Sequence, residues 1–212
     1  MKLKPHLNKL ESTTRLHNLE VPVIGLTGGI ATGKSTVSKI LQKKGLPIID
    51  ADQLVKNIYA QPDTIQHIQK LYPQVIDQGV IQFPKLRELF FQNEKVKSEI
   101  EQYIYRKLPA AFKEAYHRLG DPTFVVYDVP LLFEKKLEQM VDVSLVVYAP
   151  RKVQLARLMK RDGHLEEMAL TILSHQMDIE DKKLKADYLI NNSQTEAELE
   201  VEINQFLQNA TI

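Results

Sequence analysis

The strongest constraint on the fold is a glycine-rich loop that follows an apolar stretch near the start of the chain. Residues 23–26 read VIGL, and residues 28–35 read GGIATGKS. This is the pattern G-x-x-x-x-G-K-[ST], the Walker A or P-loop motif, in the strand–loop–helix context that it needs. Val37, Ile40 and Leu41 then recur at helical spacing. A glycine-rich turn that matched the pattern by chance would lack this context.

The chemistry that such a loop supports is the binding of a nucleoside triphosphate. Its backbone N–H groups wrap a phosphate, its glycines allow a close approach, and the helix that begins near Lys34 adds its positive dipole end. We expect Lys34 to reach the β and γ phosphates of ATP and the Ser35 hydroxyl to ligate Mg²⁺. The predicted ATP-binding residues are Gly29, Ile30, Ala31, Thr32, Gly33, Lys34, Ser35 and Thr36.

Composition excludes several broad classes. The 212 residues suit one compact domain with an insert, and 43% hydrophobic and 26% charged residues are ordinary globular values. A net charge of +1 is not that of a general nucleic-acid binder, and the absence of cysteine excludes disulfides and thiolate metal sites. No apolar run reaches the length of a membrane span, and residues 1–20 lack the apolar core of a secretory signal. We therefore expect a cytoplasmic protein.

Segments of strand and helix character alternate after residue 22. Apolar or β-branched runs predict strands at 46–50, 124–128, 143–148 and 188–190, with helices between them. Such alternation is typical of an α/β fold whose parallel sheet is covered by helices on both faces. Together with the P-loop it predicts the three-layer P-loop NTPase architecture.

Two segments do not fit the sheet. Residues 61–118 have helical periodicity and no convincing strand, which predicts a helical insert. Residues 150–185 are helical and highly charged, as expected of a lid that moves over phosphates. Gly163 is expected to end its first helix, and a second helix is expected from about residue 165 to residue 177. We assign a flexible extension to residues 1–20 and a single domain to residues 21–212, whose core comprises 21–60, 119–149 and 186–212.

Three acidic residues at strand ends are candidates for chemistry. Asp50 and Asp52 follow the second predicted strand, at the edge of the sheet where α/β proteins bind ligands. Asp52 is the candidate base that takes a proton from a substrate hydroxyl, whereas Asp50 either supports the site or caps the next helix. Asp128 ends its strand in the Walker B manner and is predicted to orient Mg²⁺, although alone it also fits an ordinary turn.

Basic residues in the two helical segments are candidates for phosphate contacts. Arg157 and Arg161 are four residues apart and share a helix face, where guanidinium groups can stabilise charge on a transferring phosphoryl group. Arg87 and Arg106, in the insert, can meet an anionic acceptor. Each of these arginines also fits the simpler interpretation of a solvated surface charge.

Several motifs together resemble the dephospho-coenzyme A kinase family. They cover the chain from Val23 to its end and are LTGGI at 26–30, GKST at 33–36, IDAD at 49–52, DVPLLFE at 128–134, QLAR at 154–157, KRD at 160–162 and ADYLINN at 186–192. The P-loop is shared by many families, but IDAD and DVPLLFE are far more selective.

The resemblance implies ATP- and Mg²⁺-dependent phosphorylation of the ribose 3′-hydroxyl of dephospho-coenzyme A, the last step of coenzyme A synthesis. It also implies an acceptor-binding role for the insert, a lid that supplies Arg157 and Arg161, and a monomer that forms at most weak oligomers. By matching position, Thr27 and Asp52 would face the acceptor hydroxyl and Asn192 would lie near the ATP base. The expected substrate-binding residues are Thr27, Asp52, Arg87, Arg106 and Asp128.

The chain departs from the family pattern at a few positions. Ala31 stands where the loop usually has glycine, which we expect a negative φ to accommodate, and Arg106-Lys107 stands where the insert usually has His-Pro. Thr171 replaces a family arginine, and Ser193 replaces the glycine of an Asn-Asn-Gly ending. None of these changes removes a residue that cradles phosphate or the candidate base.

Two other functions remain open from the sequence. One is a different P-loop kinase, which acts on a nucleoside monophosphate or on another small-molecule hydroxyl. The other is a protein that senses ATP or coenzyme A without turnover, against which Asp52 and Asp128 argue because a sensor needs no base.

Overall fold

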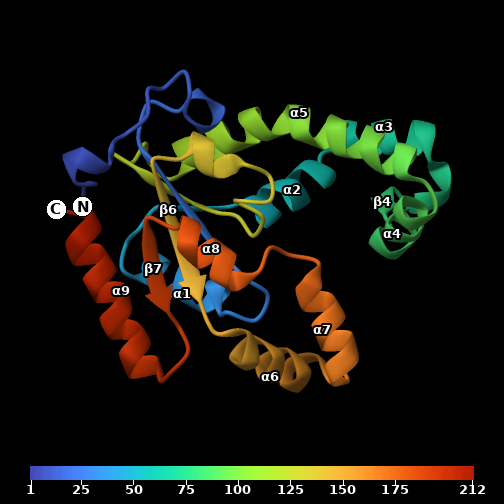
Figure 1. The fold of residues 1–212 in the computed structure, drawn as a ribbon. Coiled ribbons are helices and arrows are strands. Elements are labelled where there is room, and N and C mark those ends of the chain that lie inside the picture. The colour runs from blue at the N-terminus through green and yellow to red at the C-terminus, as the bar shows by residue number, and fades with distance from the viewer. The chain divides into compact units, whose positions relative to one another are not determined.

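The computed structural model describes residues 1–212, which form two compact units (Figure 1). The first unit comprises residues 1–49 and 119–212, and the second comprises residues 50–118. The helices and strands of the first unit are β1 (Val23–Gly28), α1 (Lys34–Lys43), β2 (Ile48–Asp50, whose last residue begins the second unit), β5 (Val125–Asp128), β6 (Val143–Tyr148), α6 (Arg151–Asp162), α7 (Glu166–Ser174), α8 (Ile179–Lys185), β7 (Tyr188–Asn191) and α9 (Glu196–Ala210). None of the helices combines the length and the apolar composition that crossing a membrane requires.

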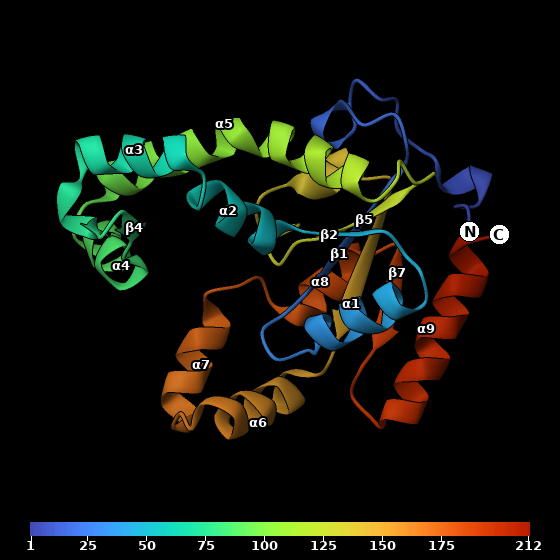
Figure 2. The same ribbon diagram turned by 180° about the vertical axis from the view of Figure 1, so that it is seen from behind.

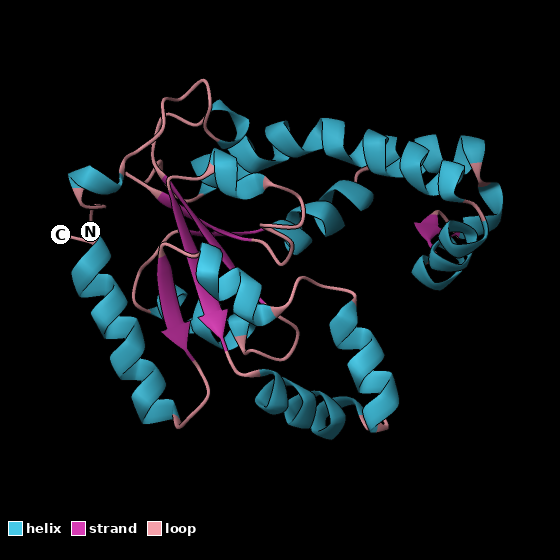
Figure 3. Ribbon diagram, viewed as in Figure 1, coloured by secondary structure: helices cyan, strands magenta, loops and turns pink.

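The strands of the first unit form one parallel sheet in the order β2-β5-β1-β6-β7 (Figure 3). Every residue of the central strand β1 is buried. Leu26 of β1 lies opposite Asp128 of β5 on one side and opposite Leu145 of β6 on the other. The P-loop therefore leaves the middle of the sheet, beside the strand that carries Asp128. The predicted α/β fold with a parallel sheet is confirmed.

Helices α1 and α9 pack on one face of the sheet through a single apolar core. Val37 and Leu41 of α1 and Leu199 and Ile203 of α9 join Val126 of the sheet in this core. On the other face, a Cβ at Gly25 would come within 2.8 Å of the side chain of Leu132, from the segment that follows β5. Both faces of the sheet are thus covered, as its continuous apolar strands require.

The amino-terminal segment packs against the first unit, and this differs from the predicted flexible extension. Leu3, Leu7, Leu16 and Leu19 are buried. The backbone of Lys2 exchanges two hydrogen bonds with that of Ile212, so the two ends of the chain lie side by side (Figure 1). The apolar residues of this segment are spaced too irregularly to indicate burial from the sequence.

A buried ion pair ties this segment to the start of β1. The carboxylate of Asp142, just before β6, accepts hydrogen bonds from Nε of Arg15 at 2.7 Å and from the backbone N–H groups of Lys9, Leu10 and Val23 at 2.8–2.9 Å. The Arg15 and Asp142 side chains are only 2% and 0% exposed. Since water does not reach the pair, each charge depends on the other for stabilisation.

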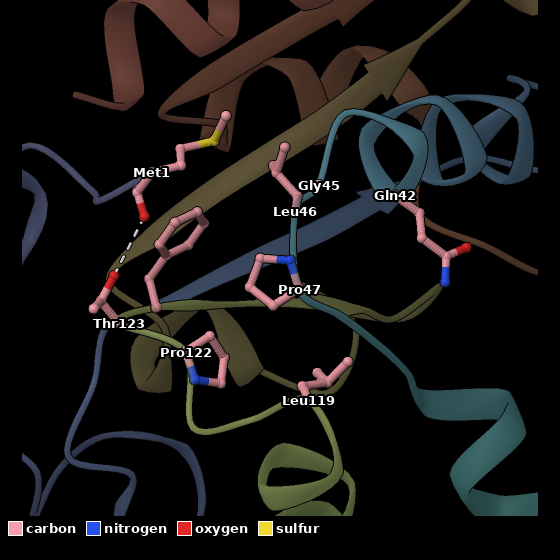
Figure 4. A pocket seen from close by; sticks show the side chains of 9 residues that line it. Met1, Gln42, Gly45, Leu46, Pro47, Leu119, Pro122 and Thr123 are labelled. Carbon is pink, nitrogen blue, oxygen red and sulfur yellow. Dashed lines mark hydrogen bonds between the residues drawn. The ribbon is translucent and has the colours of Figure 1, made fainter.

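A hollow of about 440 Å³ lies where the amino-terminal segment meets the sheet (Figure 4). The side chain of Thr123 donates to the carbonyl of Met1 at its edge, and Leu46 and Phe124 line it just before β2 and β5 begin. This is the amino end of the strands, whereas α/β sheets bind ligands at the carboxyl end. The hollow is therefore not part of the nucleotide site.

The second unit is mostly helical, as predicted for the insert. Its elements are α2 (Ala51–Tyr59), α3 (Pro62–Leu71), η3 (Pro73–Val75), β3 (Ile76–Asp77), β4 (Val80–Ile81), α4 (Phe83–Gln92) and α5 (Glu94–Arg118) (Figure 2). It begins at Asp50 instead of residue 61, because α2 packs against α5. The antiparallel hairpin β3–β4 was not expected. Gln78 and Gly79 both have positive φ at its turn, which is the geometry of a type I′ hairpin.

The predicted lid segment forms three helices. Gly163, with φ +69°, ends α6 as the sequence indicated. The second predicted helix, 165–177, is shorter in the structure, because α7 ends at Ser174. Helix α8 packs against β6 and buries Ile179 and Lys182. The last part of the segment is therefore joined to the sheet.

Replacing Arg15 tests the buried ion pair. Arg15→Met leaves the Asp142 carboxylate without its cation, and we expect the free energy of unfolding to fall by about 3–5 kcal/mol. The control Arg118→Met removes an arginine that is 60% exposed and pairs with Glu114 on the surface, and it should cost about 1 kcal/mol or less. Urea unfolding measures both. Equal losses in the two variants would contradict the assignment.

Acid should weaken the same contact. Burial raises the pKa of the Asp142 carboxyl, but hydrogen bonds from Arg15 and from the amides of Val23 and Leu10 outweigh it, so that the pKa lies below its ordinary value. A pKa that is lower in the folded chain stabilises the fold above the unfolded value, and this contribution is lost as the pH falls through the folded value. We expect the unfolding free energy to drop below about pH 4.

The variant Asp142→Asn isolates this effect in urea unfolding at about pH 7 and about pH 3. Its unfolding free energy should drop less on acidification than that of the unmodified protein. The pKa of Asp187 is also lowered, but that carboxyl is present in both proteins and does not affect the difference. An equal drop in the two proteins would contradict the prediction.

Candidate active site

The P-loop and α6 line one cavity of about 410 Å³. Its walls bring together the loop and the two arginines that the sequence singled out. The lining residues are Gly29, Ala31, Gly33, Lys34, Ser35, Arg157 and Arg161. Because α1 begins at Lys34, its first N–H groups have no intrahelical partners and its positive end faces this cavity. The arrangement suits an anion with several negative charges.

Alternate carbonyl groups of the P-loop are held by side chains from the last third of the chain. Nζ of Lys182 donates to the carbonyl of Gly28 at 3.2 Å, Nε2 of Gln154 donates to Ile30 at 2.7 Å, and Nδ2 of Asn192 donates to Thr32 at 2.7 Å. In a trans peptide the N–H group points opposite to the carbonyl. The N–H groups of residues 29, 31 and 33 are thereby turned to the other side, and these residues line the cavity.

The same side chains explain why two loop positions are glycine. A Cβ at Gly29 would collide with Nε2 of Gln154, and one at Gly33 would collide with Nδ2 of Asn192. Gly33 also has φ +88°, a conformation that favours glycine. The sequence indicated that these glycines make room for a phosphate. The structure adds that they also make room for the side chains that hold the loop.

The expectation of a negative φ at Ala31 is wrong. Its φ is +61°, in the left-handed region that only glycine adopts without cost. The Ala31 side chain packs against the apolar cluster of α6 and α7, formed by Leu158, Ala169 and Leu173. This packing helps to offset the cost of the positive φ at Ala31.

Lys34 and Asp128 form an ion pair across the sheet edge. Asp128 is 3% exposed, and the Walker B strand β5 places it beside the end of β1. Ser35 is exposed in the first turn of α1. No group of three or more His, Cys, Asp or Glu side chains is arranged to hold a metal ion. A bound Mg²⁺ would therefore draw most of its ligands from a nucleotide and water, with Ser35 and Asp128 as the nearby protein oxygens.

The two arginines of α6 have different surroundings. Arg157 is partly buried, and one of its guanidinium N–H groups donates to the carbonyl of Thr32 at 3.4 Å. Arg161 is exposed and forms two hydrogen bonds with the carboxylate of its neighbour Asp162, at 2.7 and 2.8 Å. Arg157 is thus held against the P-loop, whereas Arg161 is free to rearrange with its partner.

The predicted acceptor-binding residues lie in two places. Thr27, in β1, is fully buried and its hydroxyl donates to the carbonyl of Pro130 at 2.9 Å. Asp52, Arg87 and Arg106 are exposed on α2, α4 and α5 of the second unit. Asp50 accepts a hydrogen bond from the backbone of Gln53 at 3.0 Å, and this favours the capping role among the two that the sequence allowed.

Lys107, next to Arg106, makes its contacts within the second unit. Its ammonium group bonds to Asp63 at 2.5 Å and to Gln61 at 2.7 Å, which joins α5 to the start of α3. Arg106 is exposed, whereas Lys107 is partly buried.

Sequence reasoning missed a buried cation below the P-loop. Lys182 of α8 is fully buried, and its ammonium group also bonds to the carbonyl of Pro130 at 3.2 Å and to the carboxylate of Glu134 at 2.9 Å. Burial lowers the pKa of Lys182, Glu134 opposes this shift, and the nearby charge of Lys34 lowers the pKa further. A lysine on a charged helix carries no sequence signal of burial, so only its distant partners reveal it.

Comparisons with known proteins decide which P-loop family this geometry belongs to. The family model described as CoaE, dephospho-CoA kinase, matches residues 22–198. The chain is 36% identical over 191 residues to the dephospho-CoA kinase of Bacillus licheniformis, with 87% of this chain and 94% of the relative covered. It is 40% identical over 181 residues to that of Geobacillus kaustophilus, with 82% and 90% covered. The chain belongs to the dephospho-CoA kinase family.

Two solved structures have a similar fold, and one of them is a dephospho-CoA kinase. The dephospho-CoA kinase from Campylobacter jejuni superposes with a TM-score of 0.68 at 28% identity, over 88% of this chain and 96% of that one. A Thermus thermophilus crystal structure superposes with a TM-score of 0.78 at 28% identity, over 89% and 97%. The dephospho-CoA kinase match begins at residue 22, so the docked segment before it, with Arg15, lies outside the family model.

Replacing Lys182 tests the role of this buried cation. Lys182→Met leaves the Glu134 carboxylate and the carbonyls of Gly28 and Pro130 without their donor, and we expect a loss of about 3–5 kcal/mol in unfolding free energy. The control Lys185→Met removes an exposed lysine of the same helix and should change stability by less than about 0.5 kcal/mol. Denaturant unfolding measures both, and matching stabilities would show that the charge at 182 is dispensable.

Proposed function

We propose that this protein transfers the γ-phosphoryl group of ATP to the ribose 3′-hydroxyl of dephospho-coenzyme A. Family membership provides the reaction, the last step of coenzyme A biosynthesis, and the use of ATP. The observation that carries the proposal is the single cavity in which the P-loop, Lys34, Arg157 and Arg161 converge. Transfer forms a bond from the 3′-oxygen to the γ-phosphorus and breaks the bond to the bridging oxygen of ADP.

The cavity residues stabilise the transferring group by charge. Lys34 lies at the start of α1, from which it can leave Asp128 for the β and γ phosphates. Arg157 and Arg161 supply guanidinium groups for the charge that develops on the equatorial oxygens. Ser35 and Asp128 would hold Mg²⁺, which neutralises phosphate charge when it is bound.

Asp52 is the proposed base. It is an exposed carboxylate in the first turn of α2, and it accepts the proton of the 3′-hydroxyl as the new bond forms. Thr27, Asp128, Arg87 and Arg106 are the other proposed contacts to dephospho-coenzyme A. Thr27 needs a small rearrangement for this role, because its hydroxyl donates to Pro130.

A side-by-side assay tests the proposed substrate. ADP formation is measured with ATP, Mg²⁺ and dephospho-coenzyme A, AMP, CMP or shikimate. We expect turnover with dephospho-coenzyme A alone. Turnover with another acceptor instead would support a different P-loop kinase. Binding of ATP and dephospho-coenzyme A without product would support a sensor.

We further propose that the protein is a monomer, which size-exclusion chromatography with light scattering can test. The cytoplasmic location stays a prediction.

Replacing the proposed base separates chemistry from binding. Asp52→Ala should lower kcat by about two orders of magnitude or more, since a positioned base contributes roughly that much, while ATP binding is retained. Lys34→Ala should instead weaken both ATP binding and turnover. The control Asp77→Ala removes an exposed carboxylate of the same unit and should leave kcat unchanged. Normal kcat in Asp52→Ala would refute the role of this residue.

A further inference from the structure

Both ends of the α6–α7 pair are hydrogen-bonded to one residue of the P-loop. Gln154, in the first turns of α6, donates from Nε2 to the carbonyl of Ile30 at 2.7 Å. Gln176, just after α7, accepts at Oε1 from the N–H group of Ile30 at 3.1 Å. The backbone partners fix the orientation of both side-chain amides, since a carbonyl only accepts and an N–H group only donates. Residues 155–175 therefore form a lobe whose two stems meet at Ile30.

The side chain of Ile30 belongs to the apolar core of the same lobe. Leu158 of α6 and Ala169 and Leu173 of α7 are buried against each other, and Ile30 and Ala31 of the P-loop pack against them. Backbone and side chain of Ile30 thus both contact the lobe. The tip of the P-loop and the helix pair form one packed body within the first unit.

The anchor also sets the direction of the two arginines. Gln154, Arg157 and Arg161 are spaced by three and four residues, and such positions share one face of a helix. Gln154 is 4% exposed, so water cannot replace its hydrogen bond to Ile30. Holding Gln154 against the loop fixes the rotation of α6 about its axis, and Arg157 and Arg161 then face the cavity.

We propose that Ile30 is the anchor of the α6–α7 lobe and that Gln154 and Gln176 are positioning residues for the phosphoryl-transfer site. A nucleotide that fixes the P-loop fixes Ile30, and through these two hydrogen bonds it orders the lobe that carries Arg157 and Arg161. This inference rests on the proposed function for the identity of the nucleotide. It adds the route by which nucleotide binding places the arginines.

Two glutamate substitutions test the hydrogen bonds by their polarity. Gln176→Glu keeps an acceptor oxygen for the Ile30 N–H group, whereas Gln154→Glu replaces the needed donor with a second acceptor. We expect Gln176→Glu to keep both kcat and the KM for ATP within about twofold of the values of the unmodified enzyme. Gln154→Glu should raise the KM for ATP about tenfold and lower kcat about tenfold. Gln208→Glu makes the same change on the exposed face of α9 and should have no effect. Equal losses at 154 and 176, or no loss at either, would overturn the assignment.

Hydrogen exchange tests the coupling without phosphoryl transfer. Saturating ADP should slow amide exchange in the P-loop and in residues 155–175 of the unmodified protein. In the double variant Gln154→Leu/Gln176→Leu, ADP should still protect the P-loop but protect 155–175 about tenfold less. Single leucine variants give the same comparison if the double variant fails to fold, as judged by circular dichroism.

The outcomes separate this inference from the proposed function. Equal ADP protection of residues 155–175 in the unmodified and leucine variants would overturn the anchor. The anchor would also be overturned if, in the unmodified protein, ADP protected the P-loop but not residues 155–175. Coupled protection in a protein that transfers no phosphate to dephospho-coenzyme A would retain the anchor and refute the proposed function.

Discussion

The hydrogen bonds that hold the outward-facing carbonyls of the P-loop are the interaction on which the site depends. Lys182, Gln154 and Asn192 each take one carbonyl, at residues 28, 30 and 32. Peptide geometry then turns the intervening N–H groups toward the cavity. A loop that is partly held in this conformation gives up less entropy when an anion binds than a loop without these partners would.

Strand β1, which carries the loop, is held at both of its ends by buried charged side chains. Asp142 accepts from the N–H group of Val23 at the start of the strand, and Lys182 donates to the carbonyl of Gly28 at its end. Each of these charged side chains is buried and paired, with Arg15 and with Glu134. Breaking either pair would leave a charge in a low-dielectric interior, so the strand that carries the loop is fixed at both ends.

Local features were predictable because their signals lie within a few residues. The P-loop, the strands around residues 125–128, 143–148 and 188–191, and the end of α6 at Gly163 all follow from periodicity and glycine placement. The family resemblance added the reaction, which the comparisons confirm. The hairpin at Gln78-Gly79 was missed because its strands are only two residues long, which is too short for a period to be read.

Long-range partners were not predictable. Arg15 and Asp142 are separated by 127 residues, and Gly28 and Lys182 are separated by 154. Nothing in the sequence near Arg15, Asp142 or Lys182 marks its charged side chain as buried. The sequence alone determined the phosphate-binding chemistry, since a strand, a glycine-rich loop and a helix start are local and sufficient for it. Only the tertiary structure decided which side chains hold that loop and why Ala31 tolerates its φ. Both depend on contacts between segments that the chain brings together from opposite ends.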